Sequence, residues 1–135
     1  MIVSTRGRYA LRVLVDMAEN SGNDRIPLKE IAERQNISQK YIEAIMTLLS
    51  KNGFVDEVQG KGGGYQLNKK PSEYRVGDIL RLTEGTLAPV ACLEKDAELC
   101  PRKNECRTIP MWTKLDELVE NYLDGVTIAD LMRKS

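Results

Sequence analysis

Apolar residues recur every three or four positions near the start of the chain, in STRGRYALRVLVDMAEN (residues 4–20). This spacing predicts a helix with one buried side, and Ser4 stands where a helix cap is preferred. The side chains expected to be buried are those of Tyr9, Ala10, Val13, Leu14, Met17 and Ala18.

The same spacing predicts two more helices in close succession. A short helix is expected over LKEIAERQ (residues 28–35), and a third should begin at a Ser38 cap and end before Gly53. The residues expected to point inward are Leu28, Ile31 and Ala32 in the second helix, and Ile42, Ile45, Met46 and Leu49 in the third.

The third helix carries a polar face near its start, formed by Gln39, Lys40, Glu43 and Thr47. Only residues 35–37 separate it from the second helix. Two helices joined by so tight a turn, the second with long polar side chains near its start, are typical of a helix-turn-helix that reads DNA.

The next segment, GFVDEVQGKGGGYQL (residues 53–67), holds five of the ten glycines of the chain between two apolar, strand-like ends. We expect a β-hairpin whose tip carries Gln59 and Lys61, because glycine supplies the positive φ that such a tip requires. A hairpin directly after a recognition helix is a wing, and its small side chains let the backbone approach a narrow surface such as the minor groove.

This region has two alternative interpretations. A phosphate loop would need the GxxxxGK[ST] spacing and a following helix, whereas GKGGGY is followed by a predicted strand. The helical pair and hairpin could also be a scaffold for protein contacts, because a fold does not by itself determine function.

The second half of the chain predicts three further helices. VGDILRLTEG (residues 76–85) reads as a short packing helix, and TIADLM (residues 127–132) as a last short one that opens with a capping box. Between them lies a longer amphipathic helix, expected to pair with its copy in a homodimer through residues 111–124. Its apolar stripe is Met111, Leu115, Leu118, Val119 and Tyr122, with Asp116, Glu117, Glu120 and Asp124 outside the stripe. The alternative is an ordinary core helix of a single chain.

Charge and composition narrow the function classes. The net charge is zero, but residues 1–70 hold eleven Lys/Arg against eight Asp/Glu, and residues 71–135 hold nine against twelve. This asymmetry favours an anion-binding first half. The chain contains no histidine, the commonest general base, and no nucleophile beside a base, so we do not expect an enzyme. The sequence shows neither a membrane span nor a secretory signal, which favours a cytoplasmic protein.

All three cysteines, Cys92, Cys100 and Cys106, lie in the charged segment CLEKDAELCPRKNEC. Three thiolates from one loop suit a soft metal centre, for which iron and zinc are the candidates, although the wide gaps differ from the tight CxxC pairs of zinc sites. A thiol redox sensor or a loop without a function remains the alternative.

The order of these motifs resembles the Rrf2 family of bacterial winged helix-turn-helix transcriptional regulators. The resemblance spans residues 1–132 and rests on STRGRYALR, LKEIAERQNISQKYIE, LLSKNGFV, GKGGGYQL, VGDILRLTEG, the three spaced cysteines and the TIADL ending. It implies a mainly α fold with a small β-hairpin wing. Residues 1–70 would form the DNA-binding domain, residues 71–110 a connecting helix with a cluster-binding loop, and residues 111–135 the dimerisation helix with a short last helix.

For the cofactor, the resemblance implies an iron–sulfur cluster, [2Fe–2S] or [4Fe–4S], held by Cys92, Cys100 and Cys106. The fourth ligand does not carry over. Iron–sulfur-sensing members have a histidine three positions after the third cysteine, where this chain has Ile109. Nitric-oxide-sensing members use an acidic residue at position 8 of the partner subunit, where this chain has Arg8.

The resemblance also implies a double-stranded, palindromic DNA operator. The residues that would contact DNA bases are Gln39, Lys40 and Glu43 of the third helix and Gln59 of the wing, and those that would contact the DNA backbone are Thr5, Arg6, Tyr9, Lys51 and Lys61, with Ser38 beside them. We therefore expect a repressor that senses iron–sulfur, redox or nitrosative status through its cysteines. The alternative is a metal-free regulator of cysteine or sulfur metabolism that acts through a protein partner or through thiol oxidation.

Overall fold

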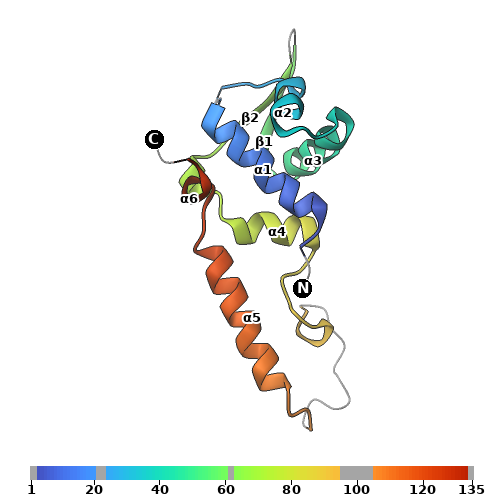
Figure 1. Ribbon diagram of the computed structural model, residues 1–135, viewed down its shortest axis with the longest axis vertical. Coiled ribbons are helices and arrows are strands. Elements are labelled where there is room, and N and C mark those ends of the chain that lie inside the picture. Colours follow the sequence, from blue (N-terminus) through green and yellow to red (C-terminus); the bar gives the residue numbers. More distant parts are fainter. Residues whose placement is uncertain (1–2, 21–23, 61–62, 95–104, 134–135) are drawn as a thin grey trace.

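The structure is a computed structural model that describes residues 3–20, 24–60, 63–94 and 105–133 (Figure 1). Within these residues it is mainly helical with one two-stranded antiparallel hairpin, which confirms the predicted fold class. The helices are α1 (Thr5–Asn20), α2 (Leu28–Gln35), α3 (Gln39–Lys51), α4 (Val76–Glu84), α5 (Ile109–Asp124) and α6 (Ile128–Leu131), the strands are β1 (Val55–Val58) and β2 (Gly64–Leu67), and the 3₁₀ turns are η1 (Pro71–Glu73) and η2 (Ala91–Leu93).

Helix α1 lies at the centre of the winged-helix part, in contact with α2, α3, α4, α6 and β2 (Figure 1). Its apolar side is buried as the spacing predicts, except that Tyr9 is only partly buried. The buried side packs against the apolar side of α3, so one core holds both helices. The core residues from these two helices are Ala10, Val13, Leu14 and Met17 of α1 and Ile42, Ile45, Met46 and Leu49 of α3.

The turn between α2 and α3 is made by residues with local reasons for their conformation. Asn36 adopts the left-handed conformation (φ 53°), which asparagine tolerates better than most residues. The Ser38 side chain then caps α3 by accepting a hydrogen bond of 3.2 Å from the Tyr41 backbone amide. The predicted cap is confirmed, and the first residues of α3 after the turn, Gln39 and Lys40, are exposed.

An ion pair between the buried Asp16 and the partly exposed Arg34 fixes α2 against α1. Asp16 is 2% exposed, and the Arg34 guanidinium donates to both of its carboxylate oxygens at 2.7–3.2 Å. The Gln35 amide donates to the same carboxylate at 2.9 Å, while Arg12 donates to the Gln35 backbone carbonyl at 2.6 Å. The end of α2, and with it the turn into α3, is thereby held at a set position on α1.

The hairpin β1–β2 forms the predicted wing, with Val55 paired to Leu67 at its base, where both are buried. Tyr65 also pairs with Ile26, through backbone bonds of 2.8 and 3.0 Å. At Gly64, where φ is +136°, a Cβ atom would lie 2.4 Å from the Ile26 carbonyl oxygen. Glycine is therefore required at this position both by the backbone conformation and by the close approach of the neighbouring segment.

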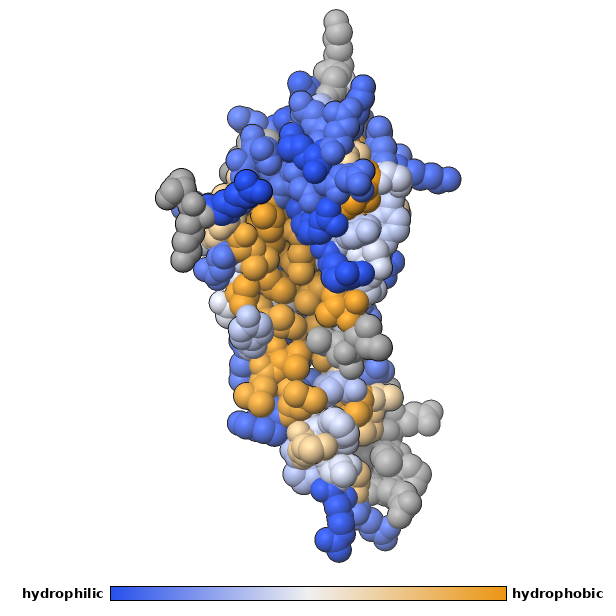
Figure 2. All heavy atoms as spheres, viewed as in Figure 1, coloured by the Kyte–Doolittle hydropathy of each residue, from blue (hydrophilic) through white to orange (hydrophobic). Residues whose placement is uncertain are grey.

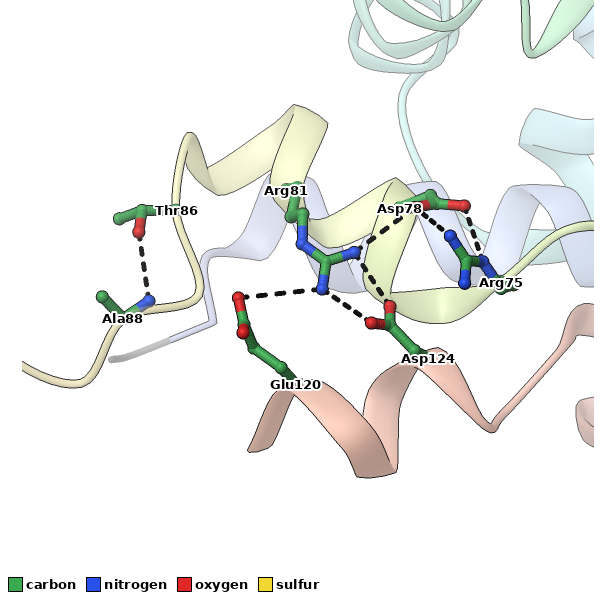
Figure 3. Close-up of polar contacts among 7 residues, drawn as sticks. All are labelled: Arg75, Asp78, Arg81, Thr86, Ala88, Glu120 and Asp124. Carbon is green, nitrogen blue, oxygen red and sulfur yellow. Dashed lines mark hydrogen bonds and ion pairs between the residues drawn. The ribbon is translucent and has the colours of Figure 1, made fainter. Parts of the chain in front are cut away.

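Helix α4 joins the winged-helix part to α5 through a small apolar cluster and an ion-pair network. Val76, Leu80 and Leu87 pack with Val119 and Leu123 of α5. Beside them the Arg81 guanidinium donates to both carboxylate oxygens of Asp124, at 2.8 and 2.9 Å, and lies 3.8 Å from Glu120, as Figure 3 shows. The hydrogen bonds from Arg81 lower the pKa of Asp124 below its usual value.

This network refines the prediction for α5. Asp116, Glu120 and Asp124 lie outside the apolar stripe, as predicted, and they are partly buried on the side of α5 that faces the α4 region, where Arg81 and the loop after α4 meet them. Val119 was expected in the outward apolar stripe and instead packs on α4. Glu117 is exposed, as predicted.

The rest of the predicted stripe is exposed in the single chain. We call Met111, Leu115, Leu118 and Tyr122 the apolar face of α5, and their exposed fractions are 53%, 38%, 55% and 70%. Figure 2 shows an apolar band that runs along much of α5 and continues onto the helical part above it. Among the described residues, no helix is long and apolar enough to cross a membrane.

Candidate nucleic-acid interface and cysteine segment

The polar face of α3 lies beside the wing. Gln39, Lys40 and Glu43 are exposed at the start of α3. Gln39 and Glu43 line a groove whose opposite wall includes Glu57 and Tyr65 of the wing strands. The Thr47 hydroxyl instead donates to the Glu43 backbone carbonyl at 2.9 Å, one turn back along the helix. The groove brings helix and wing residues together.

The groove holds two carboxylates, Glu43 and Glu57, near Tyr65, and Lys29 also belongs to its lining. Burial raises the pKa of the Tyr65 hydroxyl, and the negative charges of Glu57 and Glu43 raise it further, while a hydrogen bond with Thr47 lowers it. Two carboxylates so placed repel phosphate groups and accept hydrogen bonds from base amino groups. The two carboxylates are therefore suited to base edges and not to phosphates, whereas the ammonium group of Lys29 is compatible with a phosphate.

The first turn of α1 holds two of the expected backbone contacts. Thr5 and Arg6 are exposed, but each already has a partner within the chain. The Arg6 guanidinium donates to the Thr83 carbonyl of α4 at 2.6 Å, and the Thr5 hydroxyl accepts from Arg8 at 3.2 Å. In this conformation the Arg6 side chain is directed to α4.

A small aromatic cluster connects α1 to the start of α3. The Tyr9 and Tyr41 rings meet edge to face with centroids 5.5 Å apart, and the Arg12 guanidinium lies 5.1 Å from the Tyr9 centroid. Tyr9 is among the predicted DNA contacts, whereas Arg12 and Tyr41 are not. Tyr41 stands two residues after Gln39 and is 37% exposed, so an exposed aromatic residue on the first turn of α3, beside the predicted contacts, was the available signal.

The remaining expected contacts lie apart from this cluster. Lys51 is exposed on the last turn of α3, about 18 Å along the helix axis from Gln39. Gln59 is exposed on the wing just after β1. Lys61 lies outside the described residues. The Ser38 hydroxyl is occupied as the α3 cap.

The predicted metal ligands belong to residues 85–106, the cysteine segment, which joins α4 to α5. Cys92 is an exposed thiol in η2, and Cys106 is half-buried just before α5, with its sulfur 3.4 Å from the Thr108 hydroxyl. Cys100 lies outside the described residues, and the described part of the chain contains no group of three metal-binding side chains. The donor set remains chemically suited to iron, because thiolates are the ligands that iron–sulfur clusters use.

Comparison with known proteins gives consistent matches over nearly the whole chain. Residues 3–134 match the family described as "Rrf2: Iron-dependent Transcriptional regulator". Protein rrf2 of Nitratidesulfovibrio vulgaris is 38% identical over 98% of this chain and 88% of its own length.

Two solved structures share the fold over nearly the whole of this chain. CymR, the global cysteine regulator of B. subtilis, has a TM-score of 0.76 and 33% identity, covering 97% of this chain and 95% of its own. IscR of T. potens has a TM-score of 0.74 and 34% identity, covering 97% of this chain and 85% of its own.

Proposed function

The chain belongs to the Rrf2 family of transcriptional regulators, and from this membership we propose that it is a cytoplasmic repressor that binds a palindromic operator as a homodimer. The observation that carries the proposal is the groove between α3 and the wing, which presents Gln39, Glu43 and Glu57 together. Its relatives are regulators and not enzymes.

In the proposed complex, the start of α3 enters the major groove. Glu43 accepts a hydrogen bond from a cytosine amino group, and Gln39 and Lys40 contact neighbouring bases. Gln59 on the wing approaches the minor groove, while Thr5, Arg6, Tyr9, Lys51 and Lys61 contact the backbone, with Ser38 at the α3 end of the interface. Two half-sites about one helical turn apart then match the two-fold symmetry of a dimer.

Glu43→Ala is expected to relax operator choice. Removing a carboxylate that reads one base should reduce discrimination against a wrong base by about 10-fold, because a good base contact is worth about 1–3 kcal/mol. The measurement is a set of binding titrations with operators that differ at single positions. Glu33→Ala, on the exposed side of α2, is the matched control and should leave discrimination unchanged. Undiminished discrimination in Glu43→Ala would rule out the reading role.

Sensing is assigned to an iron–sulfur cluster, [2Fe–2S] or [4Fe–4S], on Cys92, Cys100 and Cys106. Such a cluster supplies redox and nitric-oxide sensitivity when it is bound. The cysteine segment lies directly between α4 and α5, so a change in its shape shifts the population of dimer geometries, and with it the spacing of the two recognition helices. A carboxylate or a small external thiol would have to complete the ligand set, because neither Ile109 nor Arg8 can act as the family's fourth ligand.

The second candidate is a metal-free regulator of cysteine metabolism that works through a protein partner or through thiol oxidation. The similarity to CymR, the global cysteine regulator of B. subtilis, favours this candidate specifically. The exposure of Cys92 suits it equally well, because thiol oxidation requires access.

An anaerobic absorption spectrum with an iron count separates the two. The cluster hypothesis predicts visible sulfur-to-iron absorption and iron in the protein, both lost when the three cysteines are replaced by alanine. A colourless, iron-free dimer that still binds its operator, and loses affinity on oxidation, would instead establish the metal-free regulator.

A further inference from the structure

The last turn of α4 is bonded to the first turn of α1, which holds the proposed backbone contacts Thr5 and Arg6. The Glu84 carboxylate accepts hydrogen bonds from the Ser4 amide at 2.5 Å and from the Ser4 hydroxyl at 2.8 Å. Ser4 in turn caps α1, because its hydroxyl accepts from the Gly7 amide at 3.0 Å. The cap of α1 is therefore held by a residue about eighty positions further along the chain.

The two helices also touch at van der Waals distance here. A Cβ atom at Gly7 would lie 2.8 Å from a Glu84 carboxylate oxygen and 3.0 Å from the Thr83 hydroxyl. Next to this contact, the Arg6 guanidinium donates to the Thr83 carbonyl at 2.6 Å. The absence of a side chain at Gly7 allows the first turn of α1 to follow the position of Glu84 closely.

The same turn of α4 meets the cysteine segment. Glu84 is followed by Gly85 (φ +83°), and it lines a shared hollow with Thr86, Val90 and Ala91, the residue before Cys92. One turn earlier, Arg81 binds Asp124 and Glu120 of α5 (Figure 3). Residues 81–84 are therefore bonded to the proposed DNA-binding turn and to α5, and Glu84 borders the same hollow as the cysteine segment.

We propose that Glu84 is a positioning residue for the DNA-backbone contacts of α1, and that it transmits changes in the cysteine segment to Thr5 and Arg6. This inference rests on the proposed function for its biological meaning. Its physical basis is the Glu84 carboxylate at the N-terminus of α1. The helix dipole favours a negative charge there, and so do two hydrogen-bond donors, the amide N–H and the hydroxyl O–H of Ser4. Displacing Glu84 loosens the cap and changes the direction in which Arg6 leaves the helix.

The test labels one thiol and observes the first turn of α1. In a Cys100→Ser, Cys106→Ser background, iodoacetamide modifies Cys92 alone, because Cys92 is the remaining cysteine of the chain. Hydrogen exchange of the amides of residues 4–8 is measured before and after labelling. With Glu84 present, labelling is expected to accelerate exchange by about 10-fold, the size expected for one weakened charge-assisted hydrogen bond. In Glu84→Gln, exchange starts faster and labelling adds nothing.

Glu94→Gln is the matched control, because Glu94 lines the same hollow and is exposed. In Glu94→Gln, labelling of Cys92 should accelerate the exchange of residues 4–8 as much as it does in the protein that retains both Glu84 and Glu94. Exchange that does not change on labelling in the Glu84 protein, or that changes equally in Glu84→Gln, would overturn the inference. Operator affinity is measured in parallel. If the unmodified protein binds no operator, the proposed function is refuted. The exchange result then still decides the role of Glu84.

Discussion

Replacing Arg34 by methionine is expected to destabilise the chain by about 3 kcal/mol, since removing one partner of a buried ion pair leaves an uncompensated charge. Asp16 is 2% exposed and would retain Gln35 as its remaining side-chain donor. The value lies at the low end of the usual range because the Arg34 side chain is 36% exposed. Chemical denaturation of the reduced protein gives the free energy of unfolding.

A double-mutant cycle tests whether the loss comes from the pair itself. Asp16→Asn with Arg34→Met should be destabilised by less than the sum of the two single changes, because the double variant has no unpaired buried charge. Additive effects would mean that the two side chains do not depend on each other. Arg8→Met, an exposed arginine of α1, serves as the control and should change stability by less than about 0.5 kcal/mol.

The loss of stability caused by Arg34→Met should be insensitive to pH near neutrality. The hydrogen bonds and charge of Asp16 raise the pKa of Arg34 above its usual value. A raised pKa means that this contribution is complete below the unfolded-state pKa and is lost only as the pH rises through the folded-state value. The difference between Arg34→Met and the unmodified protein should therefore be constant between about pH 6 and 9.

Leu118→Glu is the second variant with a large expected effect, and it should abolish dimer formation at micromolar concentration. Leu118 is 55% exposed in the single chain and lies within the apolar face of α5. Burying the exposed half of the Leu118 side chain is worth about 1 kcal/mol, and burying a glutamate in its place costs at least about 1 kcal/mol more. Each copy therefore loses about 2 kcal/mol, and a two-fold dimer contains the residue twice. The loss of about 4 kcal/mol corresponds to about a 1,000-fold weaker dimer, measured by sedimentation equilibrium.

The control is Asn121→Glu, which adds the same charge to an exposed polar position of α5 three residues away. It should leave the dimer intact. If Leu118→Glu remains dimeric, the apolar face of α5 is not the interface and the proposed repressor geometry fails with it. A variant that becomes monomeric should also lose affinity for a two-half-site operator much more than for a single half-site.

The helices, their caps and the wing could be predicted because their causes are local. Ser4, Ser38 and Thr127 each accept a hydrogen bond from a backbone amide three residues ahead, so a short stretch of sequence contains the whole interaction. The glycine-rich hairpin follows from backbone freedom in the same way. Recognition of the family came from the order of these local signals.

The candidate site was predictable only in part. The exposed face of Gln39, Lys40 and Glu43 followed from helical spacing, but its partner Glu57 comes from the wing, and no sequence period connects the two elements. Tyr41 and Arg12 were not predicted because both contact the Tyr9 ring, and the contact between Tyr41 and Tyr9 forms only when α1 and α3 pack together. Nothing in the sequence indicated that Arg6 would be bonded to α4.

By itself, therefore, the sequence determined which segments form the helices and the hairpin, and the family to which the chain belongs, although α5 begins at Ile109, two residues before the predicted start. Only the tertiary structure decided which side of α5 faces its own chain, where Arg81 draws Asp124 and Glu120 inward and leaves the apolar face outside. The physical reason is the separation along the chain of the residues that interact. Caps and turns are settled by neighbours in the chain, whereas an ion pair between residues 81 and 124 exists only after the helices have packed.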